Sequence, residues 1–292
     1  MYQRRQFLIR SGLIAAASLV PAWARSAGEV AVDDTLAALE ADSGGRLGVC
    51  LVQAGSTRRL GHRLDERFPM CSTFKFLLAA AVLHQVDRGG LALDRRIAVH
   101  ATDLIAHSPV TSRHAGKDLT VRDLCRATLT TSDNAAANLL LPLVGGPAGL
   151  TAFLRAHGDA LTRSDRYEPA MNGFAPGDPR DTSSPAAMAA NLQRFVLGEA
   201  LAAGSRQQLS DWLIDNQTGD ARLRAGLPAG WRVGDKTGSN GSDTSNDVAV
   251  LWPPDGGVPW LLACYLQGSR HDDAGRDAVL RQVGQWAAGQ LA

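Results

Sequence analysis

Asp247-Val-Ala-Val-Leu-Trp252 and Pro259-Trp-Leu-Leu-Ala-Cys-Tyr-Leu-Gln267 are two apolar runs separated by Pro253-Pro-Asp-Gly-Gly257. Short apolar runs bounded by proline and glycine predict β-strands. A third late strand is predicted at Trp231–Asp235, and a closing helix from about Asp273 to Leu291. The end of the chain therefore predicts three strands and a helix that can cover them.

The beginning of the chain supplies the remaining strands. Leu47–Gln53 and Arg58–Leu64 flank Ala54-Gly55-Ser56 and predict a hairpin. Residues 32–43 have apolar side chains at helical spacing and end at Gly44-Gly45, which favours a helix stop. The simplest packing places the hairpin beside the late strands in one five-stranded antiparallel sheet, flanked by the two terminal helices.

A long helical segment lies between the two groups of strands. From Ser72 to about Asp215 the chain is rich in alanine and leucine, with Gly-Gly stops at 89–90 and 145–146. The predicted class is α+β, and the site is expected in the cleft between two lobes. The lobes are an α/β lobe at about 28–66 and 216–292, and an inserted all-helical lobe at about 67–215 that contains a long polar loop, 163–184.

Composition excludes several classes of protein. The chain has 292 residues, of which 45% are hydrophobic and 20% charged, as is ordinary for a globular protein. Disordered, collagen-like and coiled-coil chains are therefore excluded. Three of the 30 basic residues and none of the 29 acidic residues lie in the first 24 positions, so the rest of the chain is nearly balanced. This balance predicts no nucleic-acid partner.

The first 24 residues predict an export signal. Gln3-Arg4-Arg5-Gln6-Phe7-Leu8 precedes the apolar run Leu13–Val20 and the small-residue pattern Ala22-Trp23-Ala24, which a signal peptidase accepts. The paired arginines resemble a twin-arginine signal; an ordinary Sec signal or an uncleaved anchor is the alternative. The apolar run is too short to anchor stably in a bilayer. We therefore expect residues 25–292 to act in the periplasm as a monomer, with no stable membrane anchor.

The cysteines indicate neither a metal site nor a disulfide framework. Cys50, Cys125 and Cys264 lie in apolar strings, where a thiol packs as a small hydrophobic side chain, and Cys71 directly precedes Ser72. None has the short spacing to another Cys or His that is typical of zinc sites. We expect no metal and no cofactor.

Ser72-Thr-Phe-Lys75 supplies a candidate nucleophile and base. If Ser72 opens the helix that follows, Lys75 lies one turn later on the same face, so its amine can reach the hydroxyl. A serine needs a neighbour that takes its proton, and a desolvated lysine can have a pKa low enough to do so. Because a Ser-x-x-Lys tetrapeptide arises by chance about once in a chain of this length, it carries little weight alone.

Two tripeptides add polar groups of the kinds an acyl-transfer site needs. Ser132-Asp133-Asn134 is predicted in a turn between helices, where Ser132 can relay a proton, Asn134 can hold a substrate amide and Asp133 can tie the turn or simply cap the next helix. Lys236-Thr237-Gly238 is predicted on a strand, with Lys236 and Gly238 on one face and Thr237 on the other. Glycine there permits close approach of a ligand; an exposed edge lysine is the alternative.

The combination of the three motifs is far more specific than any one of them. All three in this order are roughly a one-in-a-thousand coincidence. With them, nearly the whole chain after the signal resembles the class A serine β-lactamases. The resemblance extends to Arg166-Tyr-Glu168-Pro-Ala-Met-Asn172 and Asp178-Pro-Arg180-Asp181, which resemble the family's Ω-loop.

The resemblance implies hydrolysis of the β-lactam ring of penicillins and cephalosporins, conferring resistance to these small molecules. Ser72 would form the acyl-enzyme, and Glu168 with Asn172 would hold the hydrolytic water. Whether Lys75 or Glu168 accepts the serine proton is left open. Arg166 and Asp181 would pair across the neck of the loop. The remaining implied groups are the amides of Ser72 and Ser239 as oxyanion hole, and Lys236, Thr237, Ser132 and a guanidinium as anchor for the substrate carboxylate.

Several positions depart from the family pattern. Where many relatives have an aromatic ring at the cleft mouth, this chain has His107. Arg222 resembles the arginine that some carbapenemases use in place of the one absent at Ser245. Cys71 resembles a carbapenemase cysteine, but its partner position is Asn240. We therefore expect no family-type disulfide, and the sequence does not support carbapenem hydrolysis.

Two other classes of protein remain as alternatives. A penicillin-binding carboxypeptidase or an acylated sensor would share the serine and lysine motifs but would not need Glu168 and Asn172. A structural exported protein would carry the motifs by coincidence. Turnover of a chromogenic cephalosporin, a single burst, or no reaction would separate the three.

Overall fold

Strand β9 (Trp260–Gln267) is the middle strand of a five-stranded antiparallel sheet with the order β2-β1-β9-β8-β7. The computed structural model describes residues 34–291, so the predicted export signal at 1–24 lies outside the described residues. On either side of β9 lie β1 (Arg46–Gln53) and β8 (Ser245–Trp252). The edges are β2 (Arg59–His62) and β7 (Arg232–Ser239). The predicted α+β class and sheet are confirmed.

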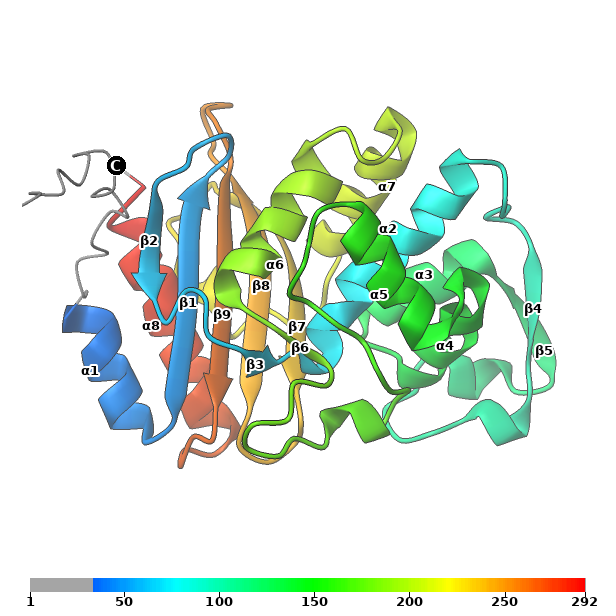
Figure 1. Ribbon diagram of the computed structural model, residues 1–292, viewed down its shortest axis with the longest axis horizontal. Helices are drawn as coiled ribbons and strands as arrows, with labels where there is room; N and C mark the ends of the chain where they lie inside the picture. Colours follow the sequence, from blue (N-terminus) through cyan, green and yellow to red (C-terminus); the bar gives the residue numbers. More distant parts are fainter. Residues whose placement is uncertain (1–33, 292) are drawn as a thin grey trace, which may run out of the picture. The chain divides into compact units, whose positions relative to one another are not determined.

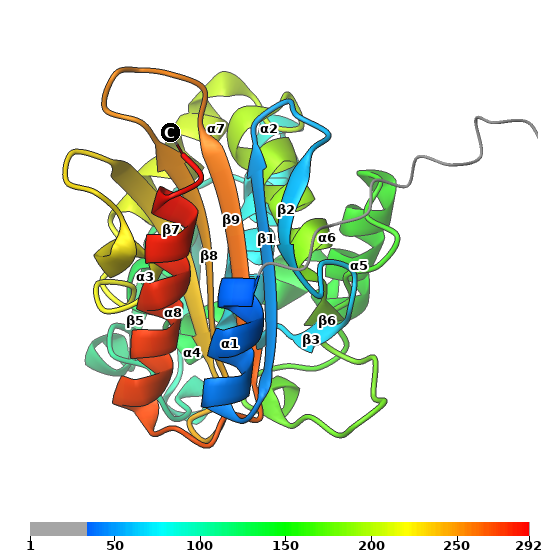
Figure 2. The same cartoon turned by 90° about the vertical axis from the view of Figure 1, so that its left-hand side faces the viewer.

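Both faces of the sheet are covered. Leu262, Cys264 and Leu266 of β9 share one buried core with residues of α1 (Asp34–Ser43) and α8 (Asp273–Ala288). Figure 2 shows these two helices lying over one face of the sheet. The alternate residues of β9 pack into a second core with the helical part of the chain; they are Leu261, Ala263 and Tyr265. Successive side chains of a strand point to opposite faces, so a strand buried on both faces is apolar throughout.

The helical part lies beyond the other face of the sheet (Figure 1). Its central helix is α2 (Phe74–Asp87), in which every residue from Phe74 to Leu83 is buried. Lys75 is thereby carried into the interior. The surrounding helices are α3 (Val121–Thr130), α4 (Asn134–Leu140), α5 (Gly146–Ala156), α6 (Pro185–Leu192) and α7 (Ala203–Ile214).

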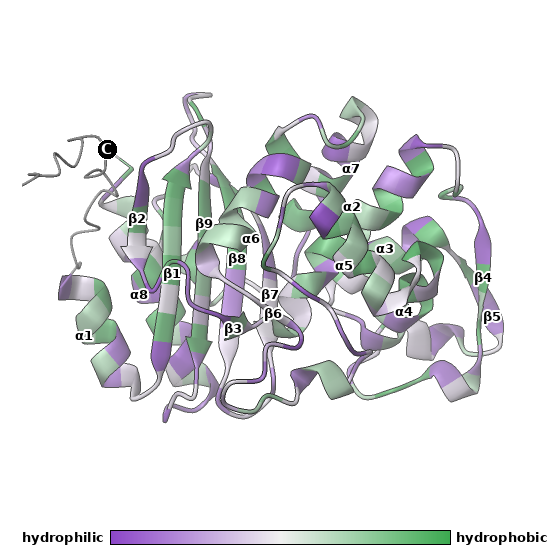
Figure 3. Ribbon diagram, in the orientation of Figure 1, coloured by the Kyte–Doolittle hydropathy of each residue, from purple (hydrophilic) through white to green (hydrophobic). Residues whose placement is uncertain are grey.

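Two small strand pairs were not predicted from the sequence. They are β3 (Phe68–Pro69) with β6 (Thr182–Ser183), and β4 (Arg96–Val99) with β5 (Lys117–Thr120). Strands of two to four residues carry too little alternation to be recognised. Figure 3 shows the contrast between the largely hydrophobic β1 and β9 and the mixed, mostly hydrophilic β4 and β5.

Membrane-spanning length was tested for the helices of residues 34–291. None is by itself long and apolar enough to cross a bilayer. The pair 134–144 and 146–156 meets the length and composition test only together, and it is bent by 66°.

Candidate active site

The nucleophile candidate lies in a tight turn at the start of the central helix. Ser72 belongs to a 3₁₀ turn, Cys71–Thr73, that leads directly into α2. Lys75 follows in the first turn of α2, and its Nζ donates to Ser72 Oγ at 2.9 Å. The spacing of three residues therefore brings amine and hydroxyl together, as the sequence predicted.

The Lys75 amine is surrounded by polar partners from two other segments of the chain. It donates to the Ser132 carbonyl oxygen at 2.8 Å and to Asn134 Oδ1 at 2.6 Å. It also lies 3.2 Å from Glu168 Oε1. Burial lowers the pKa of Lys75 below its ordinary value, although the nearby Glu168 carboxylate favours the charged form. A lysine in this setting can exchange a proton with Ser72.

Glu168 is held at both its side chain and its main chain. Ser72 Oγ donates to Glu168 Oε1 at 3.4 Å, and Asn172 Nδ2 donates to Oε2 at 2.6 Å. Asn138 Nδ2 donates to the Glu168 carbonyl oxygen at 2.8 Å, while Asn138 Oδ1 accepts from its amide at 3.0 Å. Sequence reasoning missed Asn138. The available signal was its position four residues after Asn134, which places both on one face of α4.

The loop that carries Glu168 is closed by an ion pair at its neck. Arg166 Nε donates to Asp181 Oδ2 at 2.6 Å, and Arg166 Nη2 donates to the Gly173 carbonyl oxygen at 2.8 Å. Asp181 is almost fully buried and also accepts from the Asp165 and Arg166 amides. Since Asp181 would leave a buried unpaired charge if its partner were removed, this pair differs from a solvated surface pair.

The turn between α3 and α4 brings Ser132 toward two lysines. Asp133 fixes this turn by capping α4 through the Ala136 amide at 2.9 Å and by accepting from the Val110 and Thr111 amides, each at 2.9 Å. Both readings of Asp133, cap and tie, therefore describe real contacts. Ser132 Oγ accepts from Lys75 Nζ at 3.3 Å and from Lys236 Nζ at 3.2 Å.

The opposite wall is the edge strand β7. Lys236 is fully buried, and its Nζ donates to Ser132 Oγ and to the Thr237 carbonyl oxygen. Burial and the charge of Lys75 lower the pKa of Lys236 to about 7. Thr237 Oγ1, the next side chain along the strand, has a different partner and pairs with Thr218 Oγ1 at 2.5 Å. An exposed edge lysine, the alternative interpretation, is excluded by this burial.

Position 238 must be glycine for a steric reason that the sequence did not reveal. A Cβ atom at this position would lie 2.7 Å from the Met70 carbonyl oxygen and 3.1 Å from the amides of Ser72 and Thr73. Real Cβ atoms do not approach backbone oxygen so closely. The glycine therefore lets β7 pack against the nucleophile turn, and this packing puts the Ser72 amide beside the strand that carries Ser239.

Arg222 lies at the site but is largely committed to protein partners. Its Nε donates to Asp277 Oδ1 at 2.7 Å. Its Nη1 donates to the carbonyl oxygens of Gly238 at 3.1 Å and Asn246 at 2.9 Å. A bidentate grip on a substrate carboxylate needs two nitrogens, so this geometry favours a single contact through Nη2.

These walls enclose a cleft of about 550 Å³. Ser72, Ser132, Asn134, Asn172, Thr237, Gly238, Ser239 and Arg222 line it, together with His107, Pro169 and Thr218. The His107 ring stands at the rim, with Nε2 3.1 Å from the Thr131 carbonyl oxygen, and the His107 main chain accepts from the Asn134 amide at 2.9 Å. The volume falls in the range of small-molecule sites.

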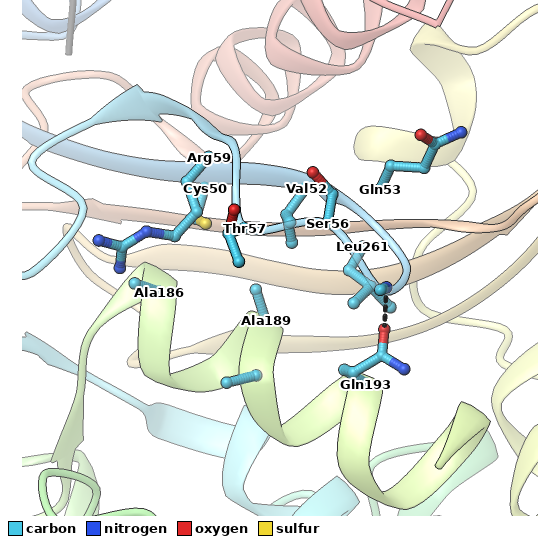
Figure 4. Close-up of a pocket in the computed structure, with 12 residues that line it drawn as sticks. Cys50, Val52, Gln53, Ser56, Thr57, Arg59, Ala186, Ala189, Gln193 and Leu261 are labelled. Atoms are coloured by element: carbon cyan, nitrogen blue, oxygen red, sulfur yellow. Dashed lines mark hydrogen bonds between the residues drawn. The ribbon is translucent and has the colours of Figure 1, made fainter. Parts of the chain in front are cut away.

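A second cavity, of about 490 Å³, lies between the β1–β2 hairpin and α6 (Figure 4). Its walls are mainly apolar, with Val52 and Leu261 from the sheet facing Ala186 and Ala189 of α6. Gln193 bridges to the Gly55 amide across it at 3.2 Å. No pair of groups suited to proton transfer lines this cavity within the described residues, so the chemistry belongs to the first cleft.

Backbone strain gathers at the cleft. Five non-glycine residues between 34 and 291 have positive φ, and four of them are site candidates. Cys71 (φ 45°), His107 (φ 59°), Ser132 (φ 57°) and Asp181 (φ 54°) are these four. Such conformations are unfavourable for L-residues and persist only where the surroundings enforce them. This clustering is typical of a functional site.

The residues near the cleft do not favour a metal site or a reactive thiol. In the part of the chain that the structure describes, no group of three or more His, Cys, Asp or Glu side chains is placed to hold a metal ion. All four cysteines are free and buried. Burial raises the pKa of the Cys71 thiol to about 12, which keeps it protonated and unreactive.

Comparison with known proteins agrees with this geometry. The model of the β-lactamase enzyme family matches residues 31–291. The chain belongs to this family. β-Lactamase L2 of Stenotrophomonas maltophilia is 59% identical over 298 residues, which cover 98% of each chain.

Solved structures agree with the class A assignment as well. A crystal structure of L2 complexed with relebactam is 62% identical, covers 90% of this chain and 97% of its own, and superposes with a TM-score of 0.87. A β-lactamase of Xanthomonas campestris pv. campestris is 57% identical, with coverage of 89% and 97% and a TM-score of 0.87. The resemblance to the class A β-lactamases drawn from the motifs is confirmed, and the protein is a serine β-lactamase.

Proposed function

We propose that this β-lactamase hydrolyses penicillins and cephalosporins through an acyl-enzyme on Ser72. The observation that carries the proposal is the continuous chain of contacts from Lys75 through Ser72 to Glu168 and Asn172. A nucleophile within reach of two proton acceptors, one of them held by an amide, is the arrangement that acylation followed by hydrolysis requires.

Acylation begins when Ser72 Oγ attacks the carbonyl carbon of the four-membered lactam. The serine proton passes to Lys75 or, through water, to Glu168, and Ser132 then relays a proton to the departing lactam nitrogen. The amides of Ser72 and Ser239 stabilise the oxyanion that forms on the carbonyl oxygen. The contacts of Lys75 with both Ser72 and Ser132 support this relay.

Deacylation needs a water molecule and a base. Glu168 takes a proton from the water as the water oxygen attacks the ester carbon. The bond from that carbon to Ser72 Oγ then breaks, and the proton returns to Ser72 Oγ from Glu168, directly or through Lys75, which restores both groups. Asn172 holds the Glu168 carboxylate from one side, while Asn138 fixes its main chain from another, so the base is kept in position during turnover. The Arg166–Asp181 pair maintains the loop that delivers it.

Substrate is anchored at the β7 wall. Lys236 supplies positive charge for the substrate carboxylate, Thr237 and Ser132 supply hydroxyl donors, and Arg222 supplies one further N–H group. Asn134 holds the amide of the substrate side chain with the Nδ2 hydrogen that is not donated to the Ala106 carbonyl oxygen. His107 forms a polar rim. Nothing in the described site supports extending the substrate range to carbapenems, because Asn240 organises the β7–β8 turn and Cys71 is unpaired.

The cellular setting follows from the sequence. We propose that residues 1–24 direct export by the twin-arginine route and that the remaining chain works in the periplasm as a monomer, without cofactor or membrane anchor. Its partner is then the small-molecule β-lactam alone.

A chromogenic cephalosporin tests the proposal. Purified residues 25–292 should show multiple turnovers, and mass spectrometry of quenched samples should find the acyl group on Ser72. A burst of one equivalent without turnover would indicate an acylated sensor or carboxypeptidase instead. Absence of any reaction by folded protein would reject the proposed function.

A further inference from the structure

Asn246 is a buried amide directly behind the nucleophile turn. It is fully inaccessible on β8, where it lies opposite Gly238 of β7. Its Nδ2 donates to the Pro69 carbonyl oxygen at 2.9 Å and to the Met70 carbonyl oxygen at 3.1 Å. Both N–H bonds of the side chain are thus directed at the two peptide groups that precede the turn.

The Met70 carbonyl oxygen is the point at which this turn is held. It accepts from Asn246 and also from the Thr73 amide at 3.2 Å and the Thr73 hydroxyl at 2.8 Å. With this carbonyl directed toward β8, the chain continues through Cys71 at φ 45° before Ser72. A cysteine is disfavoured in the left-handed region, so the contacts around it must hold it there.

Asn246 acts here as a donor and not as an acceptor. Its Oδ1 is buried and has no hydrogen-bond partner among the described residues. Leaving an amide oxygen buried and unpaired is unfavourable. The residue therefore contributes through its two N–H groups. The main chain around it is fixed as well, because Arg222 Nη1 donates to the carbonyl oxygens of both Asn246 and Gly238.

We infer that Asn246 is a positioning residue that holds the Pro69–Cys71 backbone, so that the Ser72 hydroxyl and amide face the cleft. This inference rests on the proposed function, in which Ser72 is the nucleophile and its amide part of the oxyanion hole. Asn246 touches no reacting atom. Its effect passes through the two carbonyl oxygens and the strained Cys71.

Asn246→Leu tests the inference, because leucine has a similar shape and no donor. The acylation rate, followed by stopped flow with a chromogenic cephalosporin, should fall about 10- to 100-fold, since a misplacement on the order of 1 Å can cost about 10²-fold. Substrate affinity should change little, because the anchor on β7 is untouched.

Asn191→Leu is the matched control. Asn191 of α6 is equally buried. Its Nδ2 donates to Asp159 Oδ2 at 2.6 Å and not to the nucleophile turn. Both variants should lower the melting temperature, but only Asn246→Leu should slow acylation. Parental acylation by folded Asn246→Leu, or an equal loss in the two variants, would overturn the inference.

Asn246→Asp tests the inference through the pH dependence of the acylation rate, which should not change if Asn246 only fills space. This variant also replaces the leucine variant as the test if the latter does not fold. A protonated aspartic acid can donate one bond to the turn, whereas a carboxylate can donate none and repels both carbonyl oxygens. Burial favours the protonated form, and the nearby Arg222 guanidinium opposes it; Tyr265 and Cys71, which also lie beside the position, stay protonated. The ratio of variant to parental acylation rate should therefore decrease as pH rises.

The outcomes separate this inference from the function on which it rests. A constant ratio across pH, for the folded aspartate variant, would overturn the positioning role alone. An acyl group found on a residue other than Ser72 in the parent enzyme would overturn the proposed nucleophile, and the positioning role with it.

Discussion

The two walls of the cleft are built in different ways. On the helical side, Ser72, Lys75, Ser132 and Glu168 come from three separate segments, since Ser72 and Lys75 share the start of α2. The four residues are almost fully buried and make contacts of 2.8–3.4 Å with one another. Two of the positive-φ residues, Cys71 and Ser132, lie in or beside this set. On the other side, the anchoring groups follow one another on the regular edge strand β7.

The difference reflects what each wall must do. Proton transfer requires heavy atoms within hydrogen-bond distance of each other, and no single helix or strand can supply four such groups around one point. Strained backbone and many mutual contacts are the consequence. Anchoring an anion requires charge and donors in a row, which a strand edge provides without strain. Substitutions on the two walls should therefore have effects of different kind and size.

Ser72→Ala should have the largest effect and leave the other wall intact. Turnover should fall by roughly 10⁶-fold, as in other serine hydrolases that lose the nucleophile. Penicillin should still bind, because Lys236 and its neighbours are unchanged. Mass spectrometry should find no adduct; an adduct on the folded variant would reject Ser72 as nucleophile.

Glu168→Gln should separate acylation from deacylation, the two steps that the groups of the helical wall carry out. The variant keeps the shape but removes the base, so deacylation should slow by roughly 10²- to 10⁴-fold. The chromogenic cephalosporin should then show a burst of about one equivalent while the adduct at Ser72 accumulates.

Asn172→Ala is the graded comparison for this experiment. It should slow the same step less, because the base remains and only its position is loosened. Melting temperatures of both variants must match the parent for the comparison to hold. Parental turnover by folded Glu168→Gln, with no adduct, would move the deacylating base to Lys75.

The β7 wall should respond to pH through Lys236. Its pKa of about 7 means that the amine loses its proton, and with it the anchoring charge, as pH rises through this value. KM for a penicillin should therefore increase above pH 7, by up to about tenfold per pH unit. Lys236→Arg keeps the charge and should flatten the profile; a profile that is equally steep in this variant would assign the titration to another group.

Arg222→Ala should have the smallest effect. One charge-assisted hydrogen bond through Nη2 is expected to be lost, which corresponds to an increase in KM of roughly tenfold with little change in kcat. KM for a penicillin ester, which lacks the carboxylate, should be nearly the same in the variant and in the parent. If the ester and the acid lose the same affinity, Arg222 supports the strand and does not bind substrate.

The motifs predicted a large part of the site because their spacings are local. Three residues along a helix bring Lys75 to Ser72, and the period of two along a strand separates Thr237 from Lys236. Strands and terminal helices were predicted within a few residues of their observed bounds for the same reason. The short pairs β3–β6 and β4–β5 escaped because two to four residues hold no readable period.

Other features depended on packing between distant segments. Asn138 holds Glu168 from 30 positions away, and Lys236 meets Ser132 across 104. Glycine is required at position 238 because the Met70–Thr73 turn packs against it, and nothing within the strand itself requires it. The resemblance that suggested Arg222 as the guanidinium anchor could not reveal Asp277 and the two carbonyl oxygens that accept from its Nε and Nη1.

The sequence by itself determined the fold class, the order of the motifs and the identity of the groups that carry charge and nucleophilicity. Only the tertiary structure decided which of these groups are buried together, that the pKa values of Lys75 and Lys236 are lowered, and that Asn246 faces the nucleophile turn. The physical reason is that helix and strand periods act over a few residues. Desolvation, strain and hydrogen bonds between strands and turns arise only when segments far apart in the chain are packed against each other.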